Sequence, residues 1–279
     1  MVLITPHAKN ILITHHPNIG ARGGVRGDRA SVNAVSFKTA IIIPTYNERE
    51  NLNALVPQIL AVLTASRIDG SIIVVDDSSP DGTGDLAHAL AAQHGRILVL
   101  TRKGKLGLGS AYKDGFRTAL SLGFEGLIEM DADGSHNPRF LPSFVEKLTA
   151  GYDVVIGSRY ISGGTTPHWP LQRRLLSKMA GTVARVLFGL QTRDPTSGYR
   201  AYRASALRCI DLSKVASDGY AFQVEMLALC EKRRFRVCEI PIEFVDRWIG
   251  KSKLGRKEYL QFLHAVLRLA LTTPRWDAP

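Results

Sequence analysis

From Phe37 onward, short apolar runs alternate with segments of helical periodicity, and this alternation limits the possible folds more than any other feature. It predicts strand–helix–strand units with parallel strands, in an open sheet covered by helices. The predicted strands are residues 40–43, 72–75, 97–100, 127–130 and 154–156. The predicted helices between them are residues 51–63, 85–94, 110–122 and 142–150.

The alternation stops after Tyr160, where Gly and Pro residues predict an irregular loop over residues 163–170. Further helices are predicted at residues 171–190, 221–232 and 259–271, and a further strand at residues 236–244. Residues 1–36 lack periodicity and are rich in Gly and Arg between positions 19 and 28. We expect a disordered, basic N-terminal tail there, or a start codon placed too early.

Polar residues follow each of the five predicted parallel strands at its C-terminal end, which is where open α/β sheets bind ligands. These segments are residues 44–48, 76–83, 103–109, 131–133 and 157–160. We infer one crevice that holds a polar, anionic ligand. Two local alternatives stay open: Asp77 could cap a helix or form a turn, and Gly107 with Gly109 could form the tight turn before a helix.

The fourth strand ends in Asp131-Ala132-Asp133. Alternate residues of a strand point the same way, so the two carboxylates could approach one cation together. Mg²⁺ and Mn²⁺ favour such oxygen ligands and usually retain waters and phosphate oxygens as well. The alternative interpretation of these residues is a solvated turn after a strand.

The formal charge of +11 implies an acidic partner, such as nucleic acid, anionic lipid or a phosphorylated substrate. Residues 154–193 carry six Lys or Arg residues and no Asp or Glu. Basic–aromatic interleaving and a helix-turn-helix pattern are missing, which argues against nucleic acid. No apolar window is long enough for a transmembrane helix, there is no signal-peptide pattern, and three scattered cysteines indicate a reducing compartment.

Taken together, these motifs resemble the inverting glycosyltransferases of family 2 with a GT-A fold. They resemble the polyprenyl-phosphate (dolichyl-phosphate) mannosyltransferases, also called dolichol-phosphate-mannose synthases, more closely. The resemblance covers about residues 38 to 273 and rests on residues 44–52, 76–77, 105–109, 131–133, 158–160, 194–198, 219–226 and 239–253. It implies an open, mixed, mostly parallel sheet flanked by helices, as one catalytic domain over residues 37–273, followed by a tail at 274–279.

The resemblance also implies roles for individual residues. The nucleotide base and ribose would contact Pro44, Tyr46, Glu48, Val75 and Asp77. The donor and metal would meet Asp131, Ala132 and Asp133, and the phosphates would meet Arg159, Arg247 and Lys253. Many relatives place Gln, a metal ligand, at the position of Ser135. Because a serine hydroxyl reaches less far, direct ligation would rest on Asp133, with Asp131 acting through water.

Arg173, Arg174 and Ser177 stand at the start of the predicted 171–190 helix, where we expect them to receive the acceptor phosphate. The catalytic residues would then be Asp131, Asp133, Arg159, Arg173 and Ser177. Two alternatives stay open: the two arginines could attract lipid headgroups without catalytic contact, and Asp194 could be a structural cap or turn.

The expected reaction is transfer of mannose from GDP-mannose to a polyprenyl monophosphate, with inversion, assisted by Mg²⁺ or Mn²⁺. A phosphate monoester has its second pKa near ~6, so the nucleophile is mostly dianionic at neutral pH and needs little activation by a base. The alternatives are a UDP-glucose-dependent polyprenyl-phosphate glucosyltransferase and, from another class, a non-catalytic membrane-associated scaffold.

The predicted helices 171–190 and 259–271 are amphipathic and have basic flanks. Such helices can lie in the interface of an anionic membrane, although packing into the core is the alternative. We therefore expect a peripheral protein on the cytoplasmic face of a membrane, assisted by a separate membrane-spanning partner protein.

Overall fold

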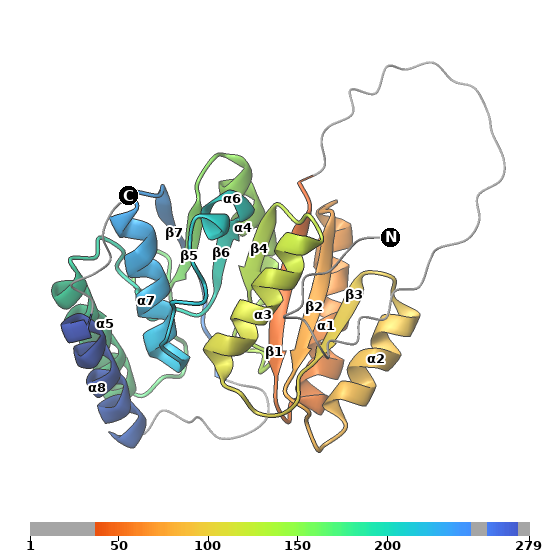
Figure 1. Ribbon diagram of the computed structural model, residues 1–279, viewed down its shortest axis with the longest axis horizontal. Coiled ribbons are helices and arrows are strands. Elements are labelled where there is room, and N and C mark those ends of the chain that lie inside the picture. The colour runs from red at the N-terminus through yellow and green to blue at the C-terminus, as the bar shows by residue number, and fades with distance from the viewer. Residues whose placement is uncertain (1–36, 247–255, 273–279) are drawn as a thin grey trace, which may run out of the picture.

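The computed structural model describes residues 37–246 and 256–272, which fold around a seven-stranded sheet (Figure 1). The strand order is β3-β2-β1-β4-β6-β5-β7. The strands are β1 (Thr39–Thr45), β2 (Gly70–Asp76), β3 (Ile97–Thr101), β4 (Gly126–Glu129), β5 (Val154–Ser158), β6 (Arg200–Arg203) and β7 (Val237–Pro241). All pairs are parallel except those that involve β6, which confirms the mixed, mostly parallel sheet.

Helices cover both faces of this sheet because the strands are apolar on both sides. Ile41 and Ile43 of β1 pack into one core cluster, and Ala40 and Ile42 pack into the other. The first cluster includes α1 (Arg49–Ala65), α2 (Thr83–Gln93) and α4 (Leu141–Thr149), and the second includes α3 (Leu108–Ser121) and α7 (Gly219–Lys232). The strands and helices predicted before Tyr160 are all present, with small shifts at their ends.

Strand β6, the strand that makes the sheet mixed, was not predicted from the sequence. It runs antiparallel between β4 and β5. Its sequence, Arg-Ala-Tyr-Arg, gives no apolar run, yet the Arg200 side chain is fully buried. Arg200 donates hydrogen bonds of 2.6 Å to the carbonyl oxygens of Pro195, Ser197 and Gln223, which satisfies its buried guanidinium.

Three smaller features also differ from the prediction. The helix α6 (Ala204–Arg208) and the 3₁₀ turn η1 (Pro138–Phe140) are additional. The last strand is shorter than predicted, since β7 ends at Pro241 and residues 243 and 244 make only isolated bridges.

The two helices predicted to be amphipathic lie at the end of the molecule opposite β3 (Figure 1). Helix α8 (Arg256–Thr272) contacts both α7 and α5 (Leu171–Phe188). Helix α5 buries only small residues, namely Ala180, Gly181 and Ala184. Its exposed large apolar side chains are Leu171, Leu175, Leu176, Met179, Val186 and Leu187.

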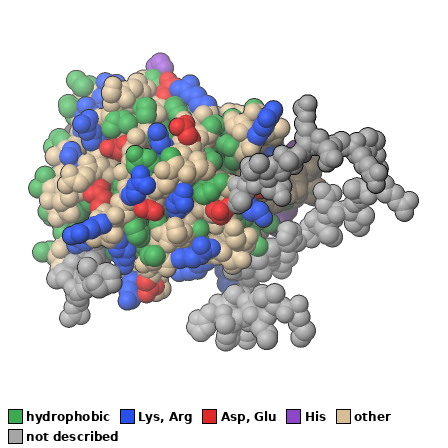
Figure 2. Space-filling model, turned by 90° about the horizontal axis from the view of Figure 1, so that it is seen from above, with side chains coloured by type: hydrophobic (Ala, Val, Ile, Leu, Met, Phe, Trp, Pro, Cys, Tyr) green, Lys and Arg blue, Asp and Glu red, His purple; other side chains and the backbone are tan. Residues whose placement is uncertain are grey.

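None of the helices in the described ranges is long and apolar enough to cross a bilayer. Figure 2 shows one face of the molecule, on which Lys and Arg side chains are spread among apolar and acidic ones. On that face the positive charge is therefore not confined to a single patch.

Candidate active site

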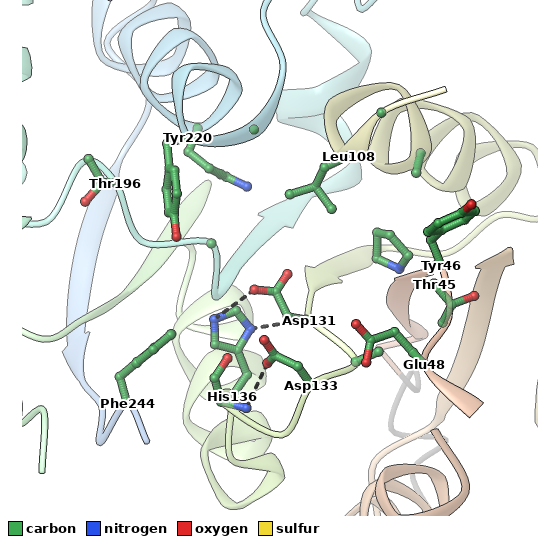
Figure 3. A pocket seen from close by; sticks show the side chains of 18 of the residues that line it. Thr45, Tyr46, Glu48, Leu108, Asp131, Asp133, His136, Thr196, Tyr220 and Phe244 are labelled. Atoms are coloured by element: carbon green, nitrogen blue, oxygen red, sulfur yellow. Dashed lines mark hydrogen bonds and ion pairs between the residues drawn. The ribbon is translucent and has the colours of Figure 1, made fainter. Parts of the chain in front are cut away.

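The parallel strands end at a common edge, and a cavity of about 320 Å³ opens there (Figure 3). Most of the predicted site residues line it: Pro44, Tyr46, Glu48, Asp77, Asp131, Ala132, Asp133, Ser135, Arg159 and Arg173. Other lining residues were not assigned from the sequence, among them Lys105, His136, Trp169, Thr196, Gly198, Tyr220, Gln223 and Phe244. The predicted crevice is therefore present.

Some predicted residues lie elsewhere. The Val75 side chain is fully buried in the core and does not line the cavity, because alternate residues of β2 point to opposite faces of the sheet. Arg174 and Ser177 are also outside the cavity lining. Arg247 and Lys253 lie outside the described residues.

Asp131 is held from two sides. One carboxylate oxygen, Oδ1, accepts a hydrogen bond of 3.0 Å from the buried Tyr112 hydroxyl on α3. The Asp131 backbone N–H donates to Nδ1 of His136 at 3.0 Å, so the proton of the neutral ring is on Nε2, which lies 3.8 Å from Asp131 Oδ2. Burial lowers the pKa of His136 below 6.5, although the charges of Asp131 and Asp133 oppose this shift.

Asp133 and Ser135 offer oxygen atoms beside Asp131. Asp133 Oδ1 accepts the Ser135 backbone N–H at 3.0 Å, and the buried Ser135 Oγ has no hydrogen-bond partner in the described part of the chain. An unpaired hydroxyl beside two carboxylates fits a divalent cation or its water. The described residues contain no group of three or more His, Cys, Asp or Glu that could hold a metal.

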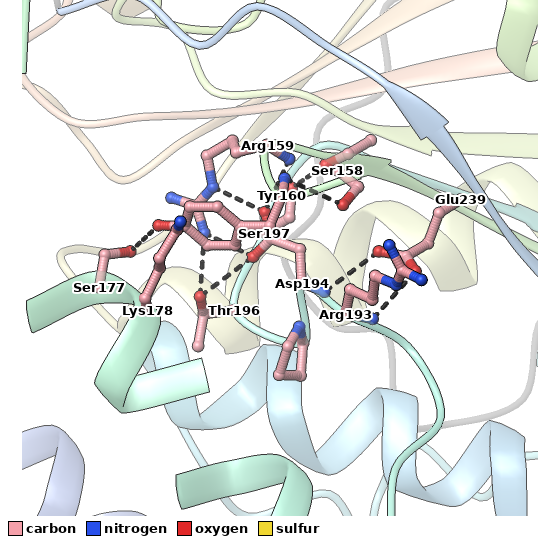
Figure 4. Close-up of polar contacts among 12 residues, drawn as sticks. Ser158, Arg159, Tyr160, Ser177, Lys178, Arg193, Asp194, Thr196, Ser197 and Glu239 are labelled. Atoms are coloured by element: carbon pink, nitrogen blue, oxygen red, sulfur yellow. Dashed lines mark hydrogen bonds and ion pairs between the residues drawn. The ribbon is translucent and has the colours of Figure 1, made fainter. Parts of the chain in front are cut away.

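The Arg159 guanidinium is buried against the carboxylate of Asp194 (Figure 4). Its Nε and Nη2 donate to the two carboxylate oxygens at 2.7 and 2.6 Å, and Nη2 also donates to Thr196 Oγ1 at 2.9 Å. Burial alone would lower the pKa of Arg159, but the Asp194 charge raises it above the ordinary value. Asp194 is thus more than a cap or turn, since it fixes a cation at the cavity wall.

A second, more open cavity of about 570 Å³ lies beside the first, and Arg159 lines both. Arg174 and Lys178 from α5 also line this second cavity, together with Tyr160. Ser177 stands behind Tyr160, whose hydroxyl donates to Ser177 Oγ at 2.7 Å. The three residues predicted to meet the acceptor phosphate are therefore divided: Arg173 lines the first cavity, Arg174 lines the second, and Ser177 supports its wall.

Arg173 itself has two partners at the rim. Its guanidinium carbon lies 3.9 Å from the centre of the Trp169 ring, and it forms an ion pair with Asp246. Both contacts keep its charge next to the cavity.

Asp77 also lines the first cavity and holds a neighbouring loop. Its Oδ2 accepts the Leu106 backbone N–H at 3.1 Å, and its Oδ1 lies 3.1 Å from Nε of the buried Arg102. Burial raises the pKa of Asp77, although these two contacts act against the shift. Asp77 thus connects the loop before α3 to the end of β2. In the same loop, the Nζ atom of Lys105 lies 4.4 Å from the centre of the Tyr46 ring.

Gly107 and Gly109 form a tight turn at the start of α3, in agreement with the alternative interpretation of this pair. Gly107 has a φ of +96°, and a Cβ there would lie 2.4 Å from an oxygen of Asp218. The same carboxylate accepts the Gly109 backbone N–H at 2.6 Å at the start of α3. Gly107 also lines the first cavity, so the turn forms part of its wall.

A buried polar pair joins β4 to α7 two residues before Asp131. Glu129 is fully buried, and its Oε2 accepts a hydrogen bond of 2.7 Å from Gln223 Nε2. Burial raises the pKa of Glu129 to about 8, although Arg200 and Gln223 oppose the shift. The one sequence signal for this pair was an acid inside an otherwise apolar strand.

This arrangement of fold and site is that of a nucleotide-sugar-dependent transferase, and the comparison with known proteins agrees. Residues 40–211 match glycosyl transferase family 2, and the chain belongs to that family. It is 47% identical over 233 residues to polyprenol monophosphomannose synthase of Mycolicibacterium smegmatis, with 83% of this chain and 86% of the relative covered. It is 46% identical over 241 residues to undecaprenyl-phosphate mannosyltransferase of Micrococcus luteus, with 86% and 97% covered. The resemblance to polyprenyl-phosphate mannosyltransferases is thus confirmed.

Solved structures support the fold. Glucosyl-3-phosphoglycerate synthase from Mycobacterium tuberculosis, in complex with Mn²⁺, UDP and phosphoglyceric acid, matches with a TM-score of 0.60 at 18% identity. The match covers 84% of this chain and 78% of that chain. The same enzyme with Mg²⁺ and UDP matches with a TM-score of 0.59 at 19% identity, over 83% and 78% of the chains.

We predict that Asp133→Ala lowers the rate of glycosyl transfer by about a hundredfold or more, because the metal contact expected of Asp133 would be lost, at a cost of several kcal/mol in the transition state. Initial rates with Mg²⁺ or Mn²⁺ measure the effect, and a thermal melt checks that the fold is retained. The exposed Asp85 on α2, outside the cavity, supplies the control variant Asp85→Ala. Full metal-dependent activity in Asp133→Ala would remove this residue from the site.

Proposed function

We propose that this protein transfers mannose from GDP-mannose to a polyprenyl monophosphate, with inversion at the anomeric carbon. The curated relatives suggest the sugar and the class of lipid acceptor. The structural observation that carries the proposal is the position of Arg159, a buried cation that lines two adjoining cavities. Transfer between two phosphorylated substrates needs positive charge at the place where they meet.

The first cavity would hold the sugar nucleotide. Tyr46, Glu48 and Asp77 would contact the base and ribose, with Pro44 beside them. Lys105, which also lines this cavity, would be a further contact. Val75 could take part only through its backbone. Asp131, Ala132 and Asp133 would face the sugar diphosphate. Arg247 and Lys253 remain proposed phosphate contacts, and Arg247 directly follows Asp246, the partner of the cavity-lining Arg173.

The chemistry needs charge stabilisation more than proton transfer. A bound Mg²⁺ or Mn²⁺, held by Asp133 with Asp131 and Ser135 nearby, would offset negative charge on the leaving diphosphate. Arg159 and Arg173 would add charge-assisted hydrogen bonds to the phosphate oxygens. The acceptor phosphate is already an anion at neutral pH, so no residue is assigned as general base. Direct attack on an oxocarbenium-like centre from the far side of the sugar gives inversion.

The second cavity would admit the acceptor phosphate. Arg174 and Lys178 come from α5, the helix that also exposes large apolar side chains. A lipid phosphate that enters along α5 would meet Arg174 first and Arg159 and Arg173 at the junction with the first cavity. In this proposal Ser177 acts as a positioning residue, through its hydrogen bond with Tyr160.

A polyprenyl chain leaves a bilayer only at high cost, because each buried CH₂ contributes about 0.8 kcal/mol. The enzyme therefore has to reach the lipid. We propose that the exposed apolar side chains of α5 enter the membrane interface on the cytoplasmic face, with Arg174, Lys178 and Arg185 near anionic headgroups. A separate membrane-spanning partner protein would hold it there more firmly.

The transfer reaction is tested with radiolabelled GDP-mannose or UDP-glucose and a short polyprenyl phosphate, with and without Mg²⁺ or Mn²⁺. We expect metal-dependent transfer from GDP-mannose, at least a hundredfold faster than from UDP-glucose, because the base and sugar contacts differ. NMR of the product reports the anomeric configuration. Transfer from UDP-glucose alone would support the glucosyltransferase alternative, and transfer from neither donor would support the scaffold.

Membrane attachment is tested by flotation with anionic liposomes. We expect binding at low salt that weakens as salt is added, and binding at least tenfold weaker for the double variant Leu175→Asp/Leu176→Asp, because two exposed apolar contacts are lost. Leu122→Asp is the matched control, since Leu122 is 39% exposed and Leu176 is 40% exposed. A protein that stays in the supernatant at low salt, yet efficiently glycosylates an acceptor embedded in bilayers, would contradict the proposal.

A further inference from the structure

Arg102 is a buried arginine that directly follows β3 and does not line the first cavity. Its backbone N–H donates to the Asp76 carbonyl oxygen at 2.8 Å, and its own carbonyl oxygen accepts the Ser78 hydroxyl. Nη2 of its side chain donates to Ser110 Oγ, on α3, at 2.5 Å. Arg102 therefore connects the turn after β2 to the first turn of α3.

The charge of Arg102 faces a carboxylate of the cavity wall. Its Nε lies 3.1 Å from Oδ1 of Asp77, which lines the first cavity, and 3.6 Å from Oδ2 of Asp114 on α3. Asp114 has a second, half-exposed partner, since Nη1 of Arg117 lies 2.9 Å from its Oδ1. Burial of an arginine is costly unless its charge is paired, so its place here indicates that positive charge is needed next to Asp77.

The surroundings of Asp77 favour the neutral form of its carboxyl group. Burial raises the pKa of Asp77, and the charges of Asp76 and Asp114 act in the same direction, whereas the Leu106 backbone N–H and the Arg102 guanidinium lower it. Of these groups, only Arg102 brings a positive charge. A carboxylate accepts stronger hydrogen bonds from O–H and N–H groups than a neutral carboxyl group does. Without Arg102, Asp77 would be a poorer acceptor for a ligand in the cavity.

We propose that Arg102 is a positioning residue for the donor: through its ion pair it holds the Asp77 carboxylate ready to accept O–H or N–H groups of the nucleoside. Arg102 acts through Asp77 and does not touch the ligand itself. The inference rests on the proposed function, which places the nucleoside of the sugar nucleotide at Asp77. It assigns a role in donor binding to a residue that lies outside the cavity.

The first test measures the dissociation constant of GDP by calorimetry, at about pH 8 and at about pH 6, for proteins that a thermal melt shows to be folded. We expect Arg102→Gln to weaken binding about tenfold at the higher pH. The ratio of variant to wild-type constants should be larger at the lower pH, because loss of the positive charge raises the pKa of Asp77 and more of it is then protonated. Arg117→Gln is the matched control, since it removes the other arginine at Asp114 and keeps the ion pair with Asp77.

The outcomes of this test separate the inference from the proposed function. Wild-type protein that binds no GDP would contradict the proposed donor, and this inference with it. Wild-type protein that binds GDP, with a variant whose constant is unchanged or whose loss does not grow at the lower pH, would overturn this inference alone.

Arg102→Lys is a second variant, which also serves if Arg102→Gln does not fold. It keeps a positive charge next to Asp77 and loses the nitrogen that donates to Ser110. We expect it to bind GDP within about threefold of wild type at both pH values. A tenfold loss in the folded Arg102→Lys protein would mean that the connection to α3 matters and the charge does not, which would overturn the proposal.

The last test is a double-mutant cycle with Asp77→Asn. Once the carboxylate is gone, Arg102 has no charge to hold, so Arg102→Gln should weaken GDP binding by less than about threefold in the Asp77→Asn background. With GDP-mannose, Arg102→Gln alone should raise the donor KM about tenfold, while kcat and the acceptor KM change by less than about threefold. Equal losses from Arg102→Gln with and without the Asp77 carboxylate, or a fall in kcat as large as the rise in donor KM, would overturn the proposal.

Discussion

The buried ion pair between Arg159 and Asp194 is the interaction on which the arrangement of the site depends. Burial of two charges is costly and is offset only when geometry and further hydrogen bonds satisfy both groups. Here the pairing is bidentate, Thr196 accepts a further hydrogen bond, and Glu239 on β7 accepts the backbone N–H groups of Arg193 and Asp194 at 2.9 and 3.1 Å (Figure 4). These contacts fix the chain from residue 194 to residue 198, which forms one wall of the first cavity.

The two halves of the sheet both supply side chains to one site, and this fixed wall lies between their contributions. The half from β1 to β4 supplies the Asp131–Asp133 motif and Asp77, and the half with β5, β6 and β7 supplies the Arg159–Asp194 pair. Strand β6, next to β4, carries the buried Arg200, whose hydrogen bonds to three carbonyl oxygens secure both the 194–198 segment and α7. The α7 helix in turn places Gln223 and Tyr220 at the cavity.

The sequence predicted the parallel part of the fold well because those strands are continuous apolar runs with polar residues at their ends. It did not predict β6, because a charged residue hides the burial of that strand. In the site, Asp77, Asp131 and Asp133 could be found because each lies within four residues of the C-terminal end of a strand. Tyr112 could not, since only the packing of α3 brings its hydroxyl to Asp131, and the hydrogen bond between His136 and the Asp131 backbone is visible only in the folded loop. Val75 was assigned to the nucleotide by family resemblance, but its side chain points into the core.

The central claim is that one cation, fixed by Asp194, serves both phosphorylated substrates. The most direct measurement is the KM of the Asp194→Asn variant for the donor and for the acceptor. It is made at a temperature at which a thermal melt shows that the variant is folded. The control is Asp211→Asn, which removes a carboxylate from an exposed ion pair with Lys214. Arg159→Lys, which keeps the charge but loses the bidentate pairing, serves as a second variant. The account predicts that both KM values rise about tenfold or more in Asp194→Asn and in Arg159→Lys, because the cation is no longer held between the cavities. A rise for one substrate alone, or no rise in either folded variant, would contradict it.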